Sequence, residues 1–181
     1  MIRLRTIGVI HTPFKEPKGT PIQPVVAEGA SGTVTVFEEF QNGLKDLEGF
    51  DRIWLIYWFH QAPEARFLVT PFLDDAERGV FATRAPCRPN PIGMSSVRLL
   101  RVDGNVLTVS DVDMIDGTAL LDIKPYAPAF DCFKVKRSGW LGKSRKRRRV
   151  ADGRFGKDGE KDGQPPARRV RTPWTNKTAL R

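Results

Sequence analysis

Cysteine and histidine are scarce in this chain of 181 residues, which contains two of each. Cys87 and Cys132 are too few for a disulfide framework and do not have metal-ligand spacing. His11 and His60 have no metal-ligating partner at a suitable spacing, and neither accompanies a serine or cysteine in a nucleophile motif. The sequence therefore predicts no metal site and no hydrolytic triad. The lack of a disulfide framework favours a reducing, cytoplasmic location.

Long apolar runs are also missing. The longest, Ile53–Phe59, is far too short to span a bilayer, so we expect no membrane association. The first residues, MIRLRTIGVIHTPF, alternate like a strand and lack the apolar stretch of a signal peptide. No G-x-G-x-x-G motif and no strand–helix alternation occur, which excludes a dinucleotide-binding fold.

Positive charge is concentrated at one end of the chain, whose net charge is +9. Residues 134–181 hold 17 Lys and Arg against 4 Asp and Glu, a net charge of +13, whereas residues 1–133 carry −4. We therefore expect a folded domain over residues 1–132 and a basic, flexible tail over residues 133–181. Such asymmetry indicates contact with a polyanion, most often nucleic acid, although a solvated charged tail is the alternative.

The pattern of the first 132 residues is mainly β. Strand-like segments cover residues 2–11, 32–37, 51–59, 66–72, 79–84, 95–104, 105–115 and 119–126. Asp103-Gly104 between two of them predicts a hairpin, and residues 38–50 have the spacing of a short helix. The segment Ile53–Phe59 is apolar on both faces, which predicts burial on both sides or a subunit interface. These elements predict a β-barrel or a strongly curved sheet.

The stretch RAPCRPNPIG, residues 84–93, has three prolines that fix their own backbone and restrict the residues before them. We expect a rigid, irregular loop, followed at Gly93 by a sharp turn or a close backbone approach. Arg84 and Arg88 make this loop either a binding element or a structural loop with paired arginines.

Acidic residues cluster at Asp111, Asp113, Asp116 and Asp122, in the segment DVDMIDGTALLDIKPY. An Asp-Gly-Thr turn offers backbone N–H groups and a carboxylate at one point, which suits a ligand with hydroxyl and amine groups. It equally suits an ordinary turn, and by itself the ordinary turn is favoured.

Taken in order, IGVIHTPFK, GLKDLEGFDRIWLIYWFHQ, GVFATRAPCRPNPIGMSSVRL and DVDMIDGTALLDIKPYAP resemble the TsaA-like (TrmO) family over roughly residues 5–131. The resemblance implies an S-adenosylmethionine-dependent methyltransferase built on a single-sheeted β-barrel and acting as a homodimer. Characterised members methylate N6 of the threonylcarbamoyladenosine beside the anticodon of certain tRNAs. The best-known members continue into a folded C-terminal domain, whereas this chain has its basic tail.

The resemblance also assigns residues to the site. It implies cofactor binding by Pro21, Ile22, Gln23, His60, Gln61, Arg84, Met94, Asp116, Gly117, Thr118 and Ala119. Arg88 and Asn90 suit either substrate-phosphate binding or bracing of the loop, and we favour binding. His60 as a buried histidine at a strand end is the alternative to its cofactor role. Asp122 and Tyr126 are conceivable proton acceptors, but no residue is selected as the general base.

Three hypotheses for the function follow. The first is a tRNA N6-methyltransferase whose basic tail grips phosphates, and the second is a methyltransferase of a small molecule or another RNA. The third is a non-catalytic nucleic-acid-binding protein, against which the restrained polar loop argues. Because the expected cofactor residues all lie between 21 and 119, we expect removal of the chain from Lys143 onward to leave cofactor binding unchanged.

Overall fold

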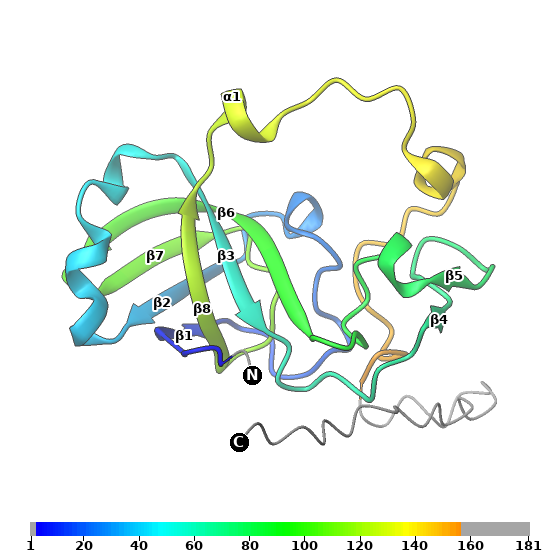
Figure 1. Ribbon diagram of the computed structural model, residues 1–181, viewed down its shortest axis with the longest axis horizontal. Coiled ribbons are helices and arrows are strands. Elements are labelled where there is room, and N and C mark those ends of the chain that lie inside the picture. The colour runs from blue at the N-terminus through cyan, green and yellow to red at the C-terminus, as the bar shows by residue number, and fades with distance from the viewer. Residues whose placement is uncertain (1–2, 157–181) are drawn as a thin grey trace, which may run out of the picture.

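The computed structural model describes residues 3–156, and its centre is a closed barrel of six antiparallel strands in the order β1-β2-β7-β6-β3-β8 (Figure 1). The strands are β1 (Gly8–His11), β2 (Ser31–Val36), β3 (Arg52–Trp58), β6 (Ile92–Asp103), β7 (Val106–Ser110) and β8 (Thr118–Pro125). Pairing of β1 with β8 closes the sheet and leaves no open edge. The prediction of a mainly β, barrel-like domain is confirmed.

The barrel is filled by the inward side chains that alternate along each strand. On β3, Ile53, Leu55 and Tyr57 are buried, whereas Trp54, Ile56 and Trp58 between them are half-buried on the outer face. The other fully buried side chains of the barrel include Ile10, Val34, Val97, Leu107, Val109 and Leu120. Strand β3 is therefore buried on one side only within a single chain.

Two connections between barrel strands show how the local sequence determines the turns. The predicted hairpin joins β6 to β7, with Asp103 still paired to Val106 and Gly104 at a φ of +58°. The predicted helix is present as two 3-10 helices instead of one α-helix, η2 (Glu38–Leu44) and η3 (Leu47–Gly49). Asp46 lies between them at a φ of +65°. This left-handed residue interrupts the helix and lets Leu44 and Leu47 both pack into the end of the barrel.

A smaller unit lies beside the barrel and replaces the longer strands expected over residues 66–72 and 79–84. It contains the two-stranded sheet of β4 (Leu68–Val69) and β5 (Arg78–Gly79). A second apolar cluster stabilises this unit and consists of Val69, Val80, Ala85, Cys87 and Phe155, with Phe72 packed against it. The remaining short helices are η1 (Pro24–Val26), η4 (Val80–Ala82), α1 (Pro128–Asp131) and η5 (Gly139–Lys143).

The chain after the barrel differs from the expected loose tail. After α1 it forms an arch, residues 132–138, and then a segment that we call the strap, residues 139–156, which returns to the smaller unit and the pocket-side loop (Figure 1). Backbone hydrogen bonds of 2.8–3.0 Å join the strap to the early loop, including Ala151 to Thr20 and Ile22 to Arg149. The indole of Trp140 donates to the carbonyl oxygen of Ala82 at 2.8 Å. Residues 157–181, the rest of the predicted tail, lie outside the described residues.

Within residues 3–156, no helix is both long enough and apolar enough to cross a membrane.

Candidate active site

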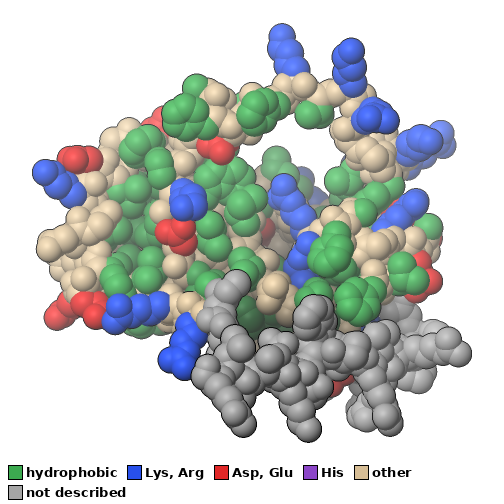
Figure 2. All heavy atoms as spheres, viewed as in Figure 1, with side chains coloured by type: hydrophobic (Ala, Val, Ile, Leu, Met, Phe, Trp, Pro, Cys, Tyr) green, Lys and Arg blue, Asp and Glu red, His purple; other side chains and the backbone are tan. Residues whose placement is uncertain are grey.

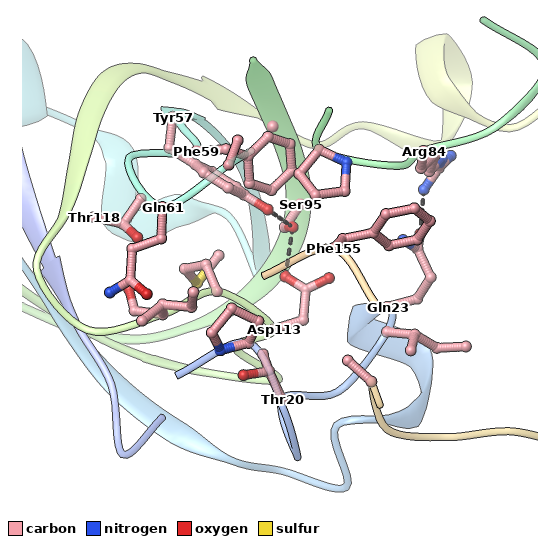
Figure 3. Close-up of a pocket in the computed structure, with 18 of the residues that line it drawn as sticks. Thr20, Gln23, Tyr57, Phe59, Gln61, Arg84, Ser95, Asp113, Thr118 and Phe155 are labelled. Atoms are coloured by element: carbon pink, nitrogen blue, oxygen red, sulfur yellow. Dashed lines mark hydrogen bonds between the residues drawn. The ribbon is translucent and has the colours of Figure 1, made fainter. Parts of the chain in front are cut away.

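A cavity of about 280 Å³ opens at the end of the barrel where β3 ends and where β6 and β8 begin (Figure 3). Six parts of the chain contribute side chains to it. They are the early loop (17–23), the end of β3 (57–62), Phe72 of the smaller unit, the proline-rich loop with the start of β6 (83–95), the approach to β8 (113–118), and the strap residues Ala151 and Phe155. The antiparallel pairing of β3 with both β6 and β8 brings these distant segments to one place.

The proline-rich loop is irregular, as predicted, and it is held in place by buried side chains and by the hydrogen bonds of Arg88. Ala85 and Cys87 are buried in the second apolar cluster. The guanidinium of Arg88 donates to the carbonyl oxygens of Val80 and Thr83 at 3.1 and 3.0 Å. Arg88 therefore lines the pocket as a brace of the loop, which is the alternative that the sequence did not favour. Asn90, the other predicted substrate-binding residue, does not line the pocket.

Gly93 provides the close backbone approach that the sequence predicted as one of two outcomes. A Cβ atom at this position would lie 2.5 Å from Cζ of Tyr57 and 2.9 Å from Cζ of Phe59. Real side chains do not tolerate such distances, so only glycine lets the two rings lie against the start of β6. The rings themselves meet edge to face, with centroids 5.3 Å apart.

A chain of hydrogen bonds at the floor of the pocket was missed by the sequence analysis. Tyr57 Oη lies 3.0 Å from Ser95 Oγ, which donates to Asp113 Oδ1 at 2.5 Å (Figure 3). Tyr57 and Ser95 are buried, and Asp113 is half-buried. Burial raises the pKa of Asp113 to about 7, against the opposing effects of Ser95 and Arg84. Burial likewise raises the pKa of Tyr57, so the phenol stays protonated.

Most of the residues predicted to bind the cofactor lie around this cavity. Eight of the eleven line it: Pro21, Ile22, Gln23, His60, Gln61, Arg84, Met94 and Thr118. Arg84 is exposed at the mouth and donates to the side-chain oxygen of Gln23. His60 is exposed and not buried, with Nδ1 3.4 Å from the hydroxyl of Thr118. The alternative of a buried strand-end histidine therefore does not hold.

The other three predicted cofactor residues, Asp116, Gly117 and Ala119, do not line the cavity. The amides of Asp116 and Gly117 donate to the carbonyl oxygens of Phe14 and Ile10, at 2.7 and 3.0 Å. The Asp116 carboxylate accepts from Thr12 N at 3.0 Å and from Lys15 Nζ at 2.7 Å. These bonds, with that to Lys15 the strongest, lower the pKa of Asp116 to about 2. The polar groups of this turn thus hold β1 to β8.

The two conceivable proton acceptors named from the sequence lie elsewhere. Asp122 pairs with Lys124 at 2.8 Å on β8, and Tyr126 packs on Trp54 with ring centroids 5.6 Å apart. Neither lines the cavity. Among the described residues, Asp113 is the only carboxylate that does.

The strap completes the wall of the pocket. Phe155, which is 7% exposed, lies in this wall (Figure 3). Its ring meets that of Phe72 at a centroid distance of 5.0 Å. Arg154 lies over the Phe72 ring and donates to the carbonyl oxygens of Thr70 and Pro71, which fixes the chain beside Phe155. The basic composition of this segment gave no sign in the sequence that Phe155 would line the pocket.

The chemistry of the lining limits what the cavity can hold. No group of three metal-ligating side chains gathers within the part of the chain that the structure describes. The walls are aromatic and aliphatic, and amide, hydroxyl, guanidinium and carboxylate groups converge between them. A ligand that joins a flat heterocycle to hydroxyl and amino-acid groups fits this combination.

Comparison with known proteins gives the same result as the motifs. Residues 9–132 match the family described as the tRNA-methyltransferase O N-terminal domain. The chain belongs to the tRNA-methyltransferase O family. A probable S-adenosyl-L-methionine-binding protein of Pyrococcus abyssi is 55% identical over 157 residues, 86% of this chain and 85% of that protein. The tRNA (adenine(37)-N6)-methyltransferase of Escherichia coli is 40% identical over 132 residues, 67% of this chain but 56% of that enzyme.

Solved structures of the tRNA-methyltransferase O family show the same fold. A crystal structure of TrmO from Pseudomonas aeruginosa superimposes with a TM-score of 0.66 at 38% identity, covering 78% of this chain and 62% of that one. The chain therefore spans somewhat more than half the length of the Escherichia coli and Pseudomonas aeruginosa relatives. The family match ends at residue 132, where the arch begins, so the strap lies beyond the matched domain.

Proposed function

We propose that the chain transfers the methyl group of S-adenosylmethionine to N6 of adenine 37 in tRNA, where that adenine carries a threonylcarbamoyl group. The observation that carries the proposal is the barrel-end cavity, which gathers eight of the residues implied by the family resemblance. The name of the Escherichia coli relative, a tRNA (adenine(37)-N6)-methyltransferase, supports the reaction. The names of the archaeal relatives, S-adenosyl-L-methionine-binding proteins, support the cofactor.

The residues of the pocket suit this cofactor. Arg84 at the mouth offers a charge-assisted partner for an amino-acid carboxylate, with Gln23 beside it. Gln61 and Thr118 offer hydrogen bonds for ribose hydroxyls, and the Phe155 ring offers an apolar wall for a base. When bound, S-adenosylmethionine supplies a methyl group that is already activated on sulfur. The protein then has mainly to align the acceptor and exclude water.

The basic arch and strap suit an RNA substrate. Residues 134–156 carry ten Lys and Arg and one Asp, and Figure 2 shows these positive side chains along the arch and over the strap. Some are matched within the fold, such as Arg149 with Glu28 and Lys146 with Asp75. The arch lysines, Lys134 and Lys136, are exposed and are suited to contact phosphates. A tRNA substrate also accords with the expected cytoplasmic location, which stays a prediction.

The outer face of the barrel supports the proposal of a homodimer. Trp54 and Trp58 are only half-buried there, and Met94 is 48% exposed. Phe130 of α1 and Phe133 at the start of the arch are each 76% exposed. A second copy of the chain on this face would bury these groups symmetrically and give two equivalent pockets. Light scattering at micromolar concentration should report a dimer, and a fully active monomer would contradict this proposal.

Methylation of tRNA followed by mass spectrometry of the nucleosides tests the reaction. The purified protein, S-adenosylmethionine and bulk tRNA should yield methylated threonylcarbamoyladenosine. A transcript of the same tRNA without modifications should yield no product, because it lacks the threonylcarbamoyl group. Equal methylation of the transcript would make plain adenine 37 the substrate. Binding of S-adenosylmethionine without methylation of either RNA would point to another acceptor.

A further inference from the structure

The carboxylate of Asp113 occupies a fixed position on the floor of the pocket. Asp113 lies between β7 and β8, and Ser95 on β6 donates a 2.5 Å hydrogen bond to its Oδ1 atom. Ser95 is held in turn by Tyr57 on β3, whose hydroxyl lies 3.0 Å away. Tyr57 cannot shift towards β6, because its ring already lies against Gly93. Three parts of the barrel therefore orient this one carboxylate.

The second oxygen of Asp113 is available to a ligand. Apart from the amide of Asp113 itself, the hydrogen bond that the described residues donate to this carboxylate comes from Ser95 and reaches Oδ1. The half-buried side chain faces the cavity (Figure 3). An oriented carboxylate oxygen that faces a cavity of this size is placed to accept a proton from a bound substrate.

The proposed reaction needs such an acceptor. The N6 nitrogen carries a proton that must leave when the nitrogen gains a methyl group. We propose that Asp113 is the catalytic residue that takes up this proton, an inference that rests on the proposed methyl transfer to N6. The nitrogen–methyl bond forms as the sulfur–methyl bond breaks. The electron pair of the broken bond stays on sulfur, and the proton of the nitrogen passes to Oδ2 of Asp113.

The surroundings of Asp113 suit this task. Burial raises its pKa to about 7, and a general base works best when its pKa lies near the working pH, here neutral. The charged and titratable groups that act on it are Arg84, which favours the carboxylate, and Tyr57, whose raised pKa keeps the phenol neutral. The imidazole of His60 also lines the cavity, but it is exposed at the mouth.

Three variants test the proposal: Asp113→Asn, Ser95→Ala and the control Asp122→Asn, which changes a carboxylate outside the cavity. Single-turnover methylation of bulk tRNA, measured from pH 5.5 to 9, should slow on the order of 10²–10⁴-fold in Asp113→Asn. Calorimetry should show that this variant keeps its affinity for S-adenosylmethionine within about threefold. The wild-type rate should rise with pH through a midpoint near 7, and Asp122→Asn should behave like wild type.

The Ser95→Ala variant gives a readout that a purely structural role would not move. The Ser95 hydrogen bond lowers the pKa of Asp113, so its removal should move the midpoint of the rate profile to higher pH. Carboxyl-carbon NMR of the protein without ligand should show the same shift, which would tie the midpoint of the rate profile to Asp113. A profile that is identical in wild type and Ser95→Ala would overturn the proposal.

Two further results distinguish failure of the proton-acceptor role from failure of the proposed methyl transfer. An active Asp113→Asn, or one whose reduced rate matches a reduced cofactor affinity, would overturn the proton-acceptor role while leaving the proposed function intact. A wild-type protein that methylates no tRNA would overturn the proposed function itself, and the role of Asp113 with it.

Discussion

The guanidinium of Arg84 and the side-chain oxygen of Gln23 are joined by a 2.5 Å hydrogen bond across the mouth of the pocket. This bond links the proline-rich loop to the early loop, so Arg84 is already oriented before any ligand arrives. Both residues were assigned to the cofactor site by the family resemblance, and the structure places them in direct contact.

Replacement of Arg84 should therefore weaken cofactor binding while the fold survives. Removing a charge-assisted hydrogen bond costs about 1.5–3 kcal/mol, so Arg84→Ala should raise the dissociation constant of S-adenosylmethionine roughly 10- to 150-fold by calorimetry. The control is Arg78→Ala, which removes an arginine paired with Asp74 away from the cavity. An unchanged dissociation constant in folded Arg84→Ala would remove this residue from the site.

The strap should contribute to cofactor binding, contrary to the expectation from sequence that residues beyond Lys143 do not matter. Phe155→Ala opens the pocket wall and should weaken S-adenosylmethionine binding by about 1 kcal/mol or more, because the aromatic ring no longer covers the ligand. Deletion from Lys143 onward should weaken it further. Phe67→Ala, at a residue that is 52% exposed and outside the cavity, is the matched control. Equal affinity in Phe155→Ala and Phe67→Ala would disprove this role.

Asp113 should make the stability of the protein depend on pH. Its folded pKa, about 7, lies above the ordinary value of 3.8, so the folded state binds more protons than the unfolded state between these values. Stability should therefore fall as the pH rises from about 4 to 7. Asp113→Asn removes the buried charge and should raise the melting temperature at pH 8 by about 2–4 °C per kcal/mol gained. At pH 4 the gain should vanish, and an equal gain at both pH values would refute this account.

Gly93 should tolerate no side chain. Gly93→Ala places a methyl group against the rings of Tyr57 and Phe59, and the resulting overpacking should cost about 1–3 kcal/mol in the free energy of unfolding. Gly49→Ala is a suitable control, because nothing lies within 4 Å of a Cβ atom there. Denaturant titration measures both. A Gly93→Ala protein as stable as the control would show that Tyr57 can move away from Ser95 at little cost.

The arch lysines should contribute to tRNA binding through charge alone. Replacing Lys134 and Lys136 by alanine should weaken binding and reduce the log–log slope against salt by about 0.7–0.9 for each phosphate that is no longer neutralised. Lys45→Ala, at the C-terminal end of η2, should change neither quantity. Filter binding across salt concentrations measures the slope, and an unchanged slope in the double variant would place RNA binding elsewhere.

Much of the fold could be predicted because its cause is local. The β-branched and aromatic residues along 52–58 and 106–110 are enough to mark strands, and Gly104 sets the hairpin between β6 and β7. That β3 has only one buried face within a single chain is seen in the structure alone. The three prolines likewise fix the loop before Ile92 irrespective of tertiary contacts. The helix was mistaken in type because its spacing fits both helix forms, whereas the left-handed residue Asp46 decides between them.

The parts of the site that the sequence did not predict come together only when the barrel closes. Tyr57, Ser95 and Asp113 are separated in sequence by 38 and 18 residues, and no spacing rule relates them until β3 pairs with β6. Asp113 was seen as one of four clustered acids, but only its position under the cavity distinguishes it from Asp116, whose carboxylate is occupied by Lys15 and Thr12. The motif that marked the family, in contrast, is continuous, which is why the pocket loop was found.

The β-bridge between Pro21 and Val150 joins the early loop to a segment that is synthesised after the barrel. All six barrel strands leave the ribosome before the strap does, so the barrel can close while one wall of the cavity has yet to be synthesised. The barrel can therefore fold first, and the strap can complete the cavity wall in a later step. Nascent chains that stop within the arch would carry a finished barrel and an unfinished pocket.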